Sequence, residues 1–197
     1  MTPIFKPKES KTDMANYRPV SVLPIYSKIF ENVILKRLQD HFLKKSFIDK
    51  NQFGYSNNSS TEIALIHTLK KVYDSVDENR ATSITTIDLS RAFDCIDFKI
   101  FFDKLHKTGL SDEFFNLLKS YFRNRCQHVR VNDSVSSIKY LRRGSPQGAV
   151  LSGFLFNFYL LSIKNLALIS TLFLFADDMK IASSAANHTE QSKTISI

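Results

Sequence analysis

The sequence has little cysteine and no long uninterrupted apolar segment. Cys95 and Cys126 are its only cysteines, too few for a disulfide framework or a cysteine-based zinc site. The longest apolar run extends from Leu166 to Ala176, contains Ser170 and Thr171, and is too short to cross a bilayer. The N-terminus also lacks the apolar region of a signal peptide. We therefore expect an intracellular chain with no membrane partner.

Several catalytic signatures are also missing from the sequence. It contains no Gly-x-x-x-x-Gly-Lys-Ser/Thr loop, no Gly-x-Ser-x-Gly elbow and no His-rich zinc pattern. These absences argue against a Walker-type nucleotidase, a serine hydrolase of the elbow type and a zinc enzyme. No internal repeat or low-complexity segment suggests a repeat architecture.

What the sequence does contain is an ordinary globular composition with a basic excess. Its 197 residues are 43% hydrophobic, and Phe is the commonest aromatic, with 17 copies. This length suits one domain, or one domain with a small lobe. The formal net charge of +8 favours a polyanionic partner, either nucleic acid or an anionic membrane surface.

Alternating helical and strand patterns predict an α+β fold. Apolar spacing of three and four predicts helices from Pro24 to about residue 45 and from the Ser59–Ser60 cap to about Val76. Ile63, Ile66, Leu69, Tyr73 and Val76 form the expected inward face of the second helix. Further helices are expected over residues 98–107, from Ser111 onward and over 149–161. Strands are expected over 82–87, in a hairpin at 126–141 and in a final hairpin near residue 177.

Adjacent carboxylates at the final hairpin are the organising feature of the sequence. Asp177 and Asp178 lie between the apolar runs 172–175 and 179–181, so they are expected in a tight turn. A solvated Asp-Asp turn is the alternative explanation, since Asp is a common turn residue. Asp88, which ends another strand-like run, favours a metal site instead. Three such carboxylates can hold two Mg²⁺ ions about 4 Å apart, the arrangement used for phosphoryl transfer.

Two other segments suggest contact with phosphates. Residues 123–143 carry six Lys or Arg side chains against Asp133 alone, which makes this the most basic window of the chain. It is either a solvated hairpin or a surface that follows a nucleic-acid backbone. The loop 143–148 precedes a helix, where backbone N–H groups favour an anion, although Gly and Pro are equally ordinary loop residues.

The chain resembles the reverse transcriptase domain of non-LTR (LINE-like) retrotransposons. The matching stretches occur in the family's order and span nearly the whole chain. They are NYRPVSVLP at 16–24, SKIFE at 27–31, QFGY at 52–55, DLSRAFD at 88–94, GSPQGAVLS at 144–152 and FADD at 175–178. Each stretch alone is weak evidence, whereas together they are highly specific.

The resemblance implies a role for each matching position. Asp88, Asp177 and Asp178 would be catalytic and would bind two Mg²⁺ ions, or Mn²⁺, together with the Leu89 carbonyl. The residues implied to contact the incoming dNTP are Arg18, Phe93, Gln147, Gly148 and, as a further candidate, Lys8. Phe93 would exclude a 2′-hydroxyl, although simple core packing also explains a Phe there. The implied partners are an RNA template, a DNA primer and dNTPs.

The resemblance also implies the architecture. We expect a right-hand polymerase palm, a small antiparallel sheet backed by helices, with partial helical fingers over about residues 1–80 and mainly palm over 81–197. The sequence matches no thumb, so we expect the chain to be an incomplete fragment of an RNA-directed DNA polymerase. The family's work on chromosomal DNA points to the nucleus.

Three alternatives stay open. An RNA-dependent RNA polymerase shares the palm carboxylates, but Ala176 and Phe93 argue against it. A group II intron maturase-like reverse transcriptase is nearer, although residues 16–23 fit the LINE-like form better. The chain could also be a non-catalytic, nucleic-acid-binding remnant of a retrotransposon.

Overall fold

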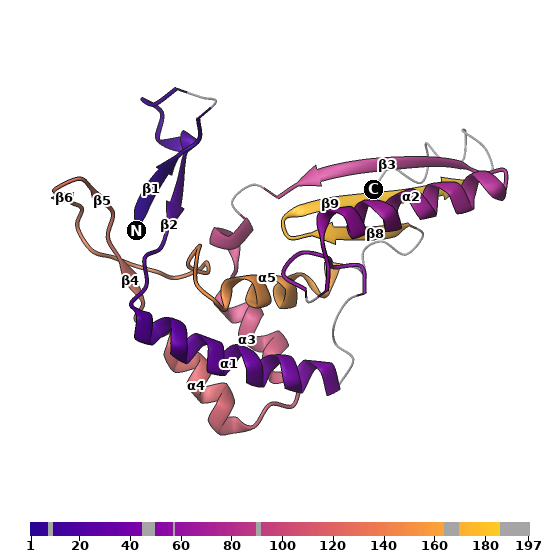
Figure 1. Ribbon diagram of the computed structural model, residues 1–197. Helices are drawn as coiled ribbons and strands as arrows, with labels where there is room; N and C mark the ends of the chain where they lie inside the picture. The colour runs from indigo at the N-terminus through magenta and orange to yellow at the C-terminus, as the bar shows by residue number, and fades with distance from the viewer. Residues whose placement is uncertain (8–9, 45–49, 57, 90–91, 164–169, 186–197) are drawn as a thin grey trace. The chain divides into compact units, whose positions relative to one another are not determined.

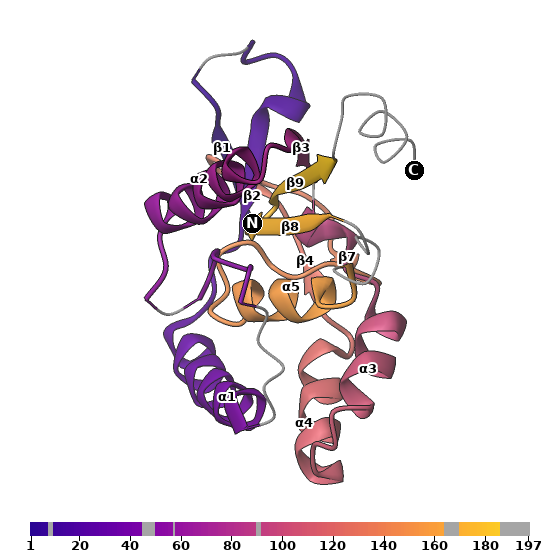
Figure 2. The ribbon, with the colours of Figure 1, turned by 90° about the vertical axis from the view of Figure 1, so that its right-hand side faces the viewer.

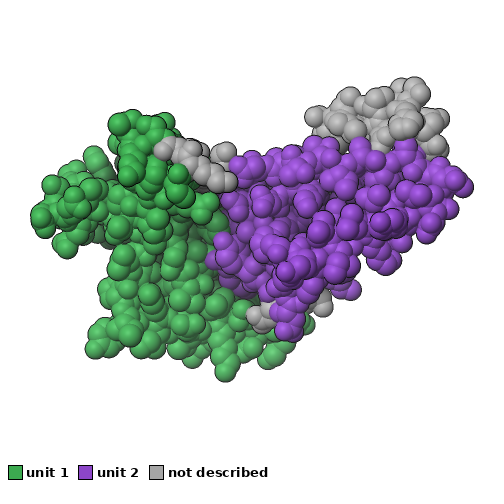
Figure 3. Space-filling view, turned by 45° about the horizontal axis from the view of Figure 1, so that its top comes forward, with its two compact units in different colours: residues 1–44, 93–152 green, residues 45–92, 153–197 purple. Residues whose placement is uncertain are grey.

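The computed structural model describes residues 1–7, 10–44, 50–56, 58–89, 92–163 and 170–185. The chain forms two units that interleave along the sequence (Figure 3). Unit 1 consists of residues 1–44 and 93–152, and unit 2 of residues 45–92 and 153–197. The predicted division into fingers and palm near residue 80 stays a prediction.

Unit 2 is built on a three-stranded antiparallel sheet in the order β3-β9-β8 (Figure 1). The strands are β3 (Ala81–Asp88), β8 (Thr171–Phe175) and β9 (Asp178–Ala185). Thr and Ile residues make β3 a good strand former, while Leu and Phe fill the buried centre of β8. The sheet confirms the predicted strand before Asp88 and the predicted final hairpin, whose second strand β9 extends to Ala185.

Helix α2 (Thr61–Asp77) packs against all three strands of this sheet (Figure 1). Its N-cap is Ser60, whose hydroxyl accepts a hydrogen bond from the Ile63 amide, so the helix begins one residue later than a Ser59 cap implies. Thr68 and Ser75 are buried, and the Ser75 hydroxyl lies 2.8 Å from that of Ser184 in β9. Small polar side chains therefore face the sheet.

The predicted inward face of α2 is wrong. Ile66, Tyr73 and Val76 are 62%, 66% and 59% exposed, and Ile63 and Leu69 are exposed as well. The spacing correctly showed that these residues share one face of the helix. It could not show which face meets the sheet, because small residues allow the helix to approach the strands closely.

Helix α5 (Ser152–Leu160) is strongly apolar, and Leu155 and Phe156 in it are buried. Its Gly153 lies against the ring of Tyr55, where an added Cβ would come within 2.4 Å of a ring carbon. One turn later, the Asn157 side chain donates a 2.7 Å hydrogen bond to the Gly54 carbonyl. These contacts fix the segment around Gly54 within unit 2.

The α-helices among the described residues of unit 1 are α1 (Ile25–Lys44), α3 (Phe98–His106) and α4 (Asp112–Phe122). Figures 1 and 2 show α3 and α4 side by side. The side chains of Asp97 and Ser111 cap these two helices, as expected for such residues. The buried side chains of this helical core are Ile34, Leu38, Phe42, Phe101, Leu105, Phe115, Leu118 and Phe122.

Short antiparallel pairs complete unit 1. Strand β1 (Thr2–Phe5) pairs with β2 (Tyr17–Val20), β4 (Cys126–Gln127) with β7 (Lys139–Tyr140), and β5 (Arg130–Val131) with β6 (Ser134–Val135). Two 3₁₀ turns, η1 (Met14–Asn16) and η2 (Ala92–Cys95), precede β2 and α3. The hairpin predicted at 126–141 is confirmed as two consecutive short ladders.

The structure confirms an α+β fold with a small antiparallel sheet. Among the residues that it describes, no helix is both long enough and apolar enough to span a lipid bilayer.

Candidate active site

The carboxylates of unit 2 meet at one end of the sheet. Asp88 is the last residue of β3, Asp178 is the first of β9, and the two are directly opposite each other in the antiparallel register. Residues directly opposite in such a pair have Cβ atoms about 4.5–5.5 Å apart on the same face of the sheet. Both side chains are exposed. The register therefore brings together two carboxylates that are far apart in the sequence.

Asp177 occupies the turn between β8 and β9. Its backbone carbonyl accepts a 3.3 Å hydrogen bond from the Leu89 amide, which extends the pairing of the two segments past Asp88. The Leu89 carbonyl in turn accepts a 3.2 Å hydrogen bond from Ala92. A carbonyl oxygen has a second lone pair, so this bond still leaves Leu89 one acceptor site.

The turn has an unusual backbone. Ala176, its first central residue, has φ of 56°, the left-handed region that normally favours Gly. Tyr55 lies near this turn, and its pKa is raised by partial burial and by the negative charge of Asp177. The negative charge of Asp177 therefore acts on the partly buried Tyr55 hydroxyl.

Oxygen ligands at a sheet end fit a hard divalent cation by chemistry. Asp88 and Asp178 supply two carboxylates on one face, and Asp177 follows directly in the chain. No three His, Cys, Asp or Glu side chains within the described ranges are already arranged as a metal-binding group. The donor types and the backbone register of Asp88 and Asp178 suit a hard cation.

The loop at 144–148 in unit 1 is held by backbone hydrogen bonds to two other segments. The Gly144 amide donates to the Ile96 carbonyl and the Ser145 amide to the Phe93 carbonyl, both at 2.8 Å. The Gln147 carbonyl accepts a 2.8 Å bond from Ser21, which directly follows β2. These bonds connect the loop to the segment that carries Phe93 and to the strand that carries Arg18.

Two glycines shape this loop. Gly144 and Gly148 have φ of 88° and 94°, which other residues rarely adopt. A Cβ at Gly148 would lie 3.3 Å from the Ser21 carbonyl oxygen. The chain thus passes close to the end of β2, with Gly148 exposed and Gln147 half-buried.

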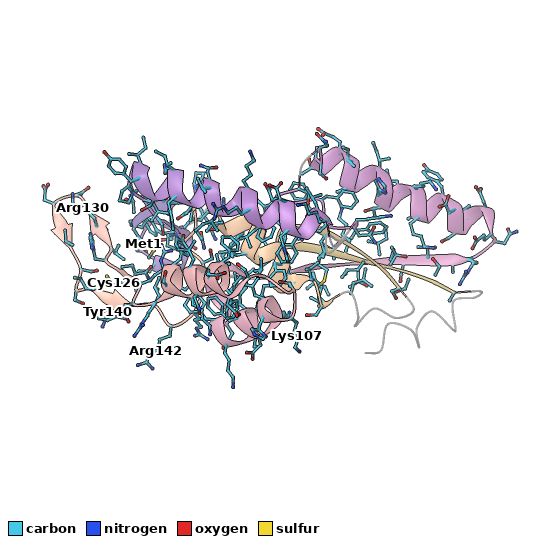
Figure 4. The ribbon with its side chains drawn as sticks, turned by 90° about the horizontal axis from the view of Figure 1, so that it is seen from below. Met1, Lys107, Cys126, Arg130, Tyr140 and Arg142 are labelled. Carbon is cyan, nitrogen blue, oxygen red and sulfur yellow. The ribbon has the colours of Figure 1, made fainter. Side chains whose placement is uncertain are left out.

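A pocket of about 390 Å³ lies in unit 1 beside this loop, which is within the size range of small-molecule sites. Its lining includes Gln147, Asp94, Pro19 and the basic pair Arg142 and Arg143. Figure 4 labels Tyr140 and Arg142, which contribute to the same lining. Both Arg142 and Arg143 are exposed, so the pocket presents positive charge to solvent.

Glu31 is a functional candidate that sequence reasoning missed. It lies in α1 and is completely buried. Its carboxylate accepts hydrogen bonds from the Tyr121 hydroxyl at 2.6 Å and from the Val150 amide at 2.7 Å. The signal was a charged residue at the first position of the buried stripe 31, 34, 38 and 42 of α1. Glu31 therefore anchors the segment that directly follows Gly148.

The structure distributes the predicted site residues between the two units. Unit 2 holds Asp88, Leu89, Asp177 and Asp178, whereas unit 1 holds Arg18, Phe93, Gln147 and Gly148. Within unit 1, Phe93 is half-buried and Arg18 is exposed. Lys8 lies outside the described residues.

Comparison with known proteins gives a family match over almost the whole chain. The model of the family "Reverse transcriptase (RNA-dependent DNA polymerase)" matches residues 6–196. A similar protein of Drosophila melanogaster, "Probable RNA-directed DNA polymerase from transposon BS", is 31% identical over 157 residues, which cover 79% of this chain and 17% of the relative.

Another relative is the RNA-directed DNA polymerase from mobile element jockey of Drosophila funebris, 29% identical over 82% of this chain and 18% of the relative. The chain thus spans less than a fifth of the length of these relatives. A solved structure of apo telomerase from Candida tropicalis, truncated from its C-terminal domain, matches with a TM-score of 0.60 and 16% identity. That match covers 84% of this chain and 36% of the telomerase chain. At this identity the likeness shows a shared fold, which agrees with the predicted palm.

Proposed function

The chain belongs to the reverse transcriptase (RNA-dependent DNA polymerase) family, and from this premise we propose that it carries the nucleotidyl-transfer site of a non-LTR retrotransposon polymerase. The observation that carries the proposal is the register that sets Asp88 opposite Asp178, with Asp177 in the adjoining turn. The fold and the family match support it. The reaction is RNA-templated DNA synthesis.

The residues proposed to bind the cations lie in unit 2. Asp88 and Asp177 are the direct ligands of divalent cations, Asp178 assists them, and the Leu89 carbonyl offers a further oxygen. Two Mg²⁺ ions, or Mn²⁺ in their place, supply activation of the primer 3′-hydroxyl and neutralisation of triphosphate charge when bound. The exposure of Asp88 and Asp178 supports access by a cation from solvent.

The residues proposed to contact the incoming nucleotide lie in unit 1. Gln147 and Gly148 contact it, and Gly148 is exposed while Gln147 is half-buried. Arg18 binds the triphosphate by charge-assisted hydrogen bonds, with Lys8 as a second candidate. Phe93 selects dNTPs over rNTPs, because its ring leaves no space for a 2′-hydroxyl.

The basic hairpins of unit 1 bind the backbone of the template or primer. Arg130, Lys139 and Arg142 are exposed, and Tyr140 is 73% exposed, a combination suited to phosphates and to stacked bases. Figure 4 shows Arg130, Tyr140 and Arg142 on the same hairpin segment. We place this work in the nucleus, where chromosomal DNA provides the primer.

Primer extension tests the proposal. Purified chain, an RNA template with a DNA primer, dNTPs and Mg²⁺ should give incorporation that falls roughly 10³-fold or more in Asp88→Asn, because transition-state charge is left unbalanced. Asp103→Asn removes the same charge from an exposed position of α3 and should leave incorporation unchanged. Equal incorporation by Asp88→Asn and the wild-type chain would refute the assignment.

The non-catalytic alternative predicts a different pattern. In that case the wild-type chain binds primer–template without extending it, and Asp88→Asn binds equally well. The salt dependence of nucleic-acid binding then identifies the residues that contact the phosphates. The double variant Arg130→Ala/Arg142→Ala should lower the slope of log affinity against log salt by about 1.4 on single-stranded nucleic acid, at about 0.7 per phosphate contact.

The matched control for the salt experiment is Lys36→Ala/Arg37→Ala. This pair removes the same charge from exposed positions of α1 and should change the slope by less than half as much. Equal changes in the two double variants would show that only net charge matters and that the hairpin is no specific surface.

A further inference from the structure

A short segment beside β8 contacts the turn that carries Asp177. The Phe53 amide donates to the Leu174 carbonyl, and the Leu174 amide donates to the Asn51 carbonyl, both at 2.8 Å. Gln52, between these two bonds, forms a parallel bridge with Leu174 and is only 6% exposed. Residues 51–53 therefore extend the sheet by one bridge next to the turn.

The Gln52 side chain bonds the turn itself. Its Oε1 accepts a 3.2 Å hydrogen bond from the Ala176 amide and a 2.9 Å bond from the Gly54 amide. In a two-residue hairpin turn, the amide of the first central residue lies outside the strand ladder and needs another partner. Gln52 provides that partner at the residue whose φ is 56°.

Gly54 makes this approach possible. A Cβ there would lie 2.1 Å from the Ala176 nitrogen, so only Gly can occupy the position without moving the turn. The Gly54 carbonyl is held from the opposite side by the Asn157 side chain, at 2.7 Å. Two side-chain amides, Gln52 and Asn157, thus hold Gly54 against the turn.

Two polar atoms of these side chains are buried and unpaired among the described residues. Gln52 Nε2 and Asn157 Oδ1 are both buried without a hydrogen-bond partner among the described residues. Buried unpaired groups are uncommon in native proteins because they lose hydration without compensation. The two unpaired atoms belong to the same side chains that hold Gly54 against the turn.

We propose that Gln52 is a positioning residue of the candidate metal site. Its amide oxygen holds Ala176 in the left-handed conformation, and this conformation sets Asp177 and Asp178 opposite the end of β3. The part of the proposal that concerns a cation rests on the proposed function. The part that concerns the turn rests on the hydrogen bonds alone, so the two are separable by experiment.

Hydrogen exchange at the Ala176 amide tests the turn directly. Gln52→Leu removes the acceptor with little change in volume and should speed exchange at Ala176 by about five- to tenfold, the effect of one net hydrogen bond. Gln52→Glu keeps an acceptor at the same place and should retain slow exchange. Gln39→Leu makes the same substitution at a half-buried position of α1 and should leave Ala176 unchanged.

An internal reference separates a local effect from general loss of stability. Exchange at Ala182, in the middle of β9, should change less than exchange at Ala176 in Gln52→Leu. Gln52→Met, which keeps an unbranched side chain, should show the same ratio if Gln52→Leu folds poorly. An equal increase at both amides, or no increase at Ala176, would overturn the positioning role.

Mn²⁺ titration provides the functional readout. Gln52→Leu should bind Mn²⁺ about five- to tenfold more weakly than the wild-type chain, because the turn no longer presents Asp177 in one conformation. Unchanged Mn²⁺ affinity in Gln52→Leu would contradict the proposal. Failure of the wild-type chain to bind Mn²⁺ would instead refute the metal site of the proposed function, while exchange at Ala176 would still decide the role of Gln52.

Discussion

Unit 1 and unit 2 hold their candidate functional residues by different physical means. In unit 2 the turn with Asp177 is shaped by close backbone packing, since Gly54 lies where a Cβ would be 2.1 Å from the Ala176 nitrogen. In unit 1 the segment after Gly148 is held by a side chain, the buried carboxylate of Glu31, 2.7 Å from the Val150 amide. The turn in unit 2 therefore depends on the missing side chain of Gly54, and the segment in unit 1 depends on the buried carboxylate of Glu31.

This difference predicts how each unit responds to substitution. Close backbone packing leaves no room for the neighbouring atoms to move. Adding one methyl group should therefore greatly lower the free energy of unfolding. A buried carboxylate tolerates changes of shape but not loss of its acceptor atoms, because the N–H and O–H groups that it satisfies would be left unpaired. Substitution of Gly54 should therefore destabilise unit 2, and substitution of Glu31 should destabilise unit 1.

The largest effect is expected for Gly54→Ala. The added Cβ would collide with the backbone of the turn, and we expect a loss of roughly 4 kcal/mol in the free energy of unfolding, confined to unit 2. Chemical denaturation with hydrogen exchange of β8 and β9 measures it. Gly109→Ala, at φ of 69°, should cost only about 1–2 kcal/mol from backbone strain. Similar losses in the two variants would show that the packing at Gly54 is not special.

Glu31→Ala should have the next largest effect. Removal of the carboxylate leaves the Tyr121 hydroxyl and the Val150 amide without partners, which should destabilise unit 1 by about 3 kcal/mol. Exchange of the Val150 amide should rise, while amides of β9 in unit 2 should be unaffected. Unaltered protection at Val150 would mean that Glu31 does not anchor this segment.

A pH titration of unit 1 sharpens the comparison further. Burial and the hydrogen bond to Glu31 raise the pKa of Tyr121 well above its usual value of about 10, against a smaller opposing effect of Arg125. The pKa of Tyr121 is higher in the folded protein than in the unfolded protein. The contribution of the protonated Tyr121 to stability is therefore complete below pH 10 and is lost as the pH rises above 10. Tyr121→Phe should flatten the loss above pH 10. Tyr26→Phe, at an exposed position of α1, should retain the full pH dependence.

The smallest effect is expected at Ala176. Gly at this position adopts φ of 56° without strain, so Ala176→Gly should stabilise unit 2 by up to about 1 kcal/mol, less the backbone entropy that Gly loses on folding. Ala182→Gly, within β9, should destabilise it instead. Destabilisation by both changes would indicate that the Ala176 methyl group matters more than its backbone conformation.

The sequence predicted the strands of the sheet well. Apolar and strand-like runs identified β3, β8 and β9, whereas Asp178, which was expected in the turn beside Asp177, is the first residue of β9. The orientation of α2 was not predictable, because periodicity places Ile66, Leu69 and Tyr73 on one face without saying what that face contacts. Small residues on the opposite face decide the matter through close packing with β9.

The supporting residues could not be predicted, because their partners are distant in the sequence. Gln52 bonds Ala176 across a separation of 124 residues, and Glu31 bonds Val150 across 119. No local pattern encodes such pairs. A polar residue at a position of an apolar helical stripe, as at Glu31, is the one feature of this kind that can be recognised from the sequence.

The most direct test of the account is a Mn²⁺ titration, followed by electron paramagnetic resonance of free Mn²⁺, of the wild-type chain, Asp88→Asn and Asp103→Asn. The pairing of Asp88 with Asp178 predicts that Asp88→Asn binds at least about tenfold more weakly than the wild-type chain, a difference of about 1.4 kcal/mol. The control Asp103→Asn should match the wild-type affinity. Equal affinities for Asp88→Asn and the wild-type chain would contradict the placement of the metal site at this end of the sheet.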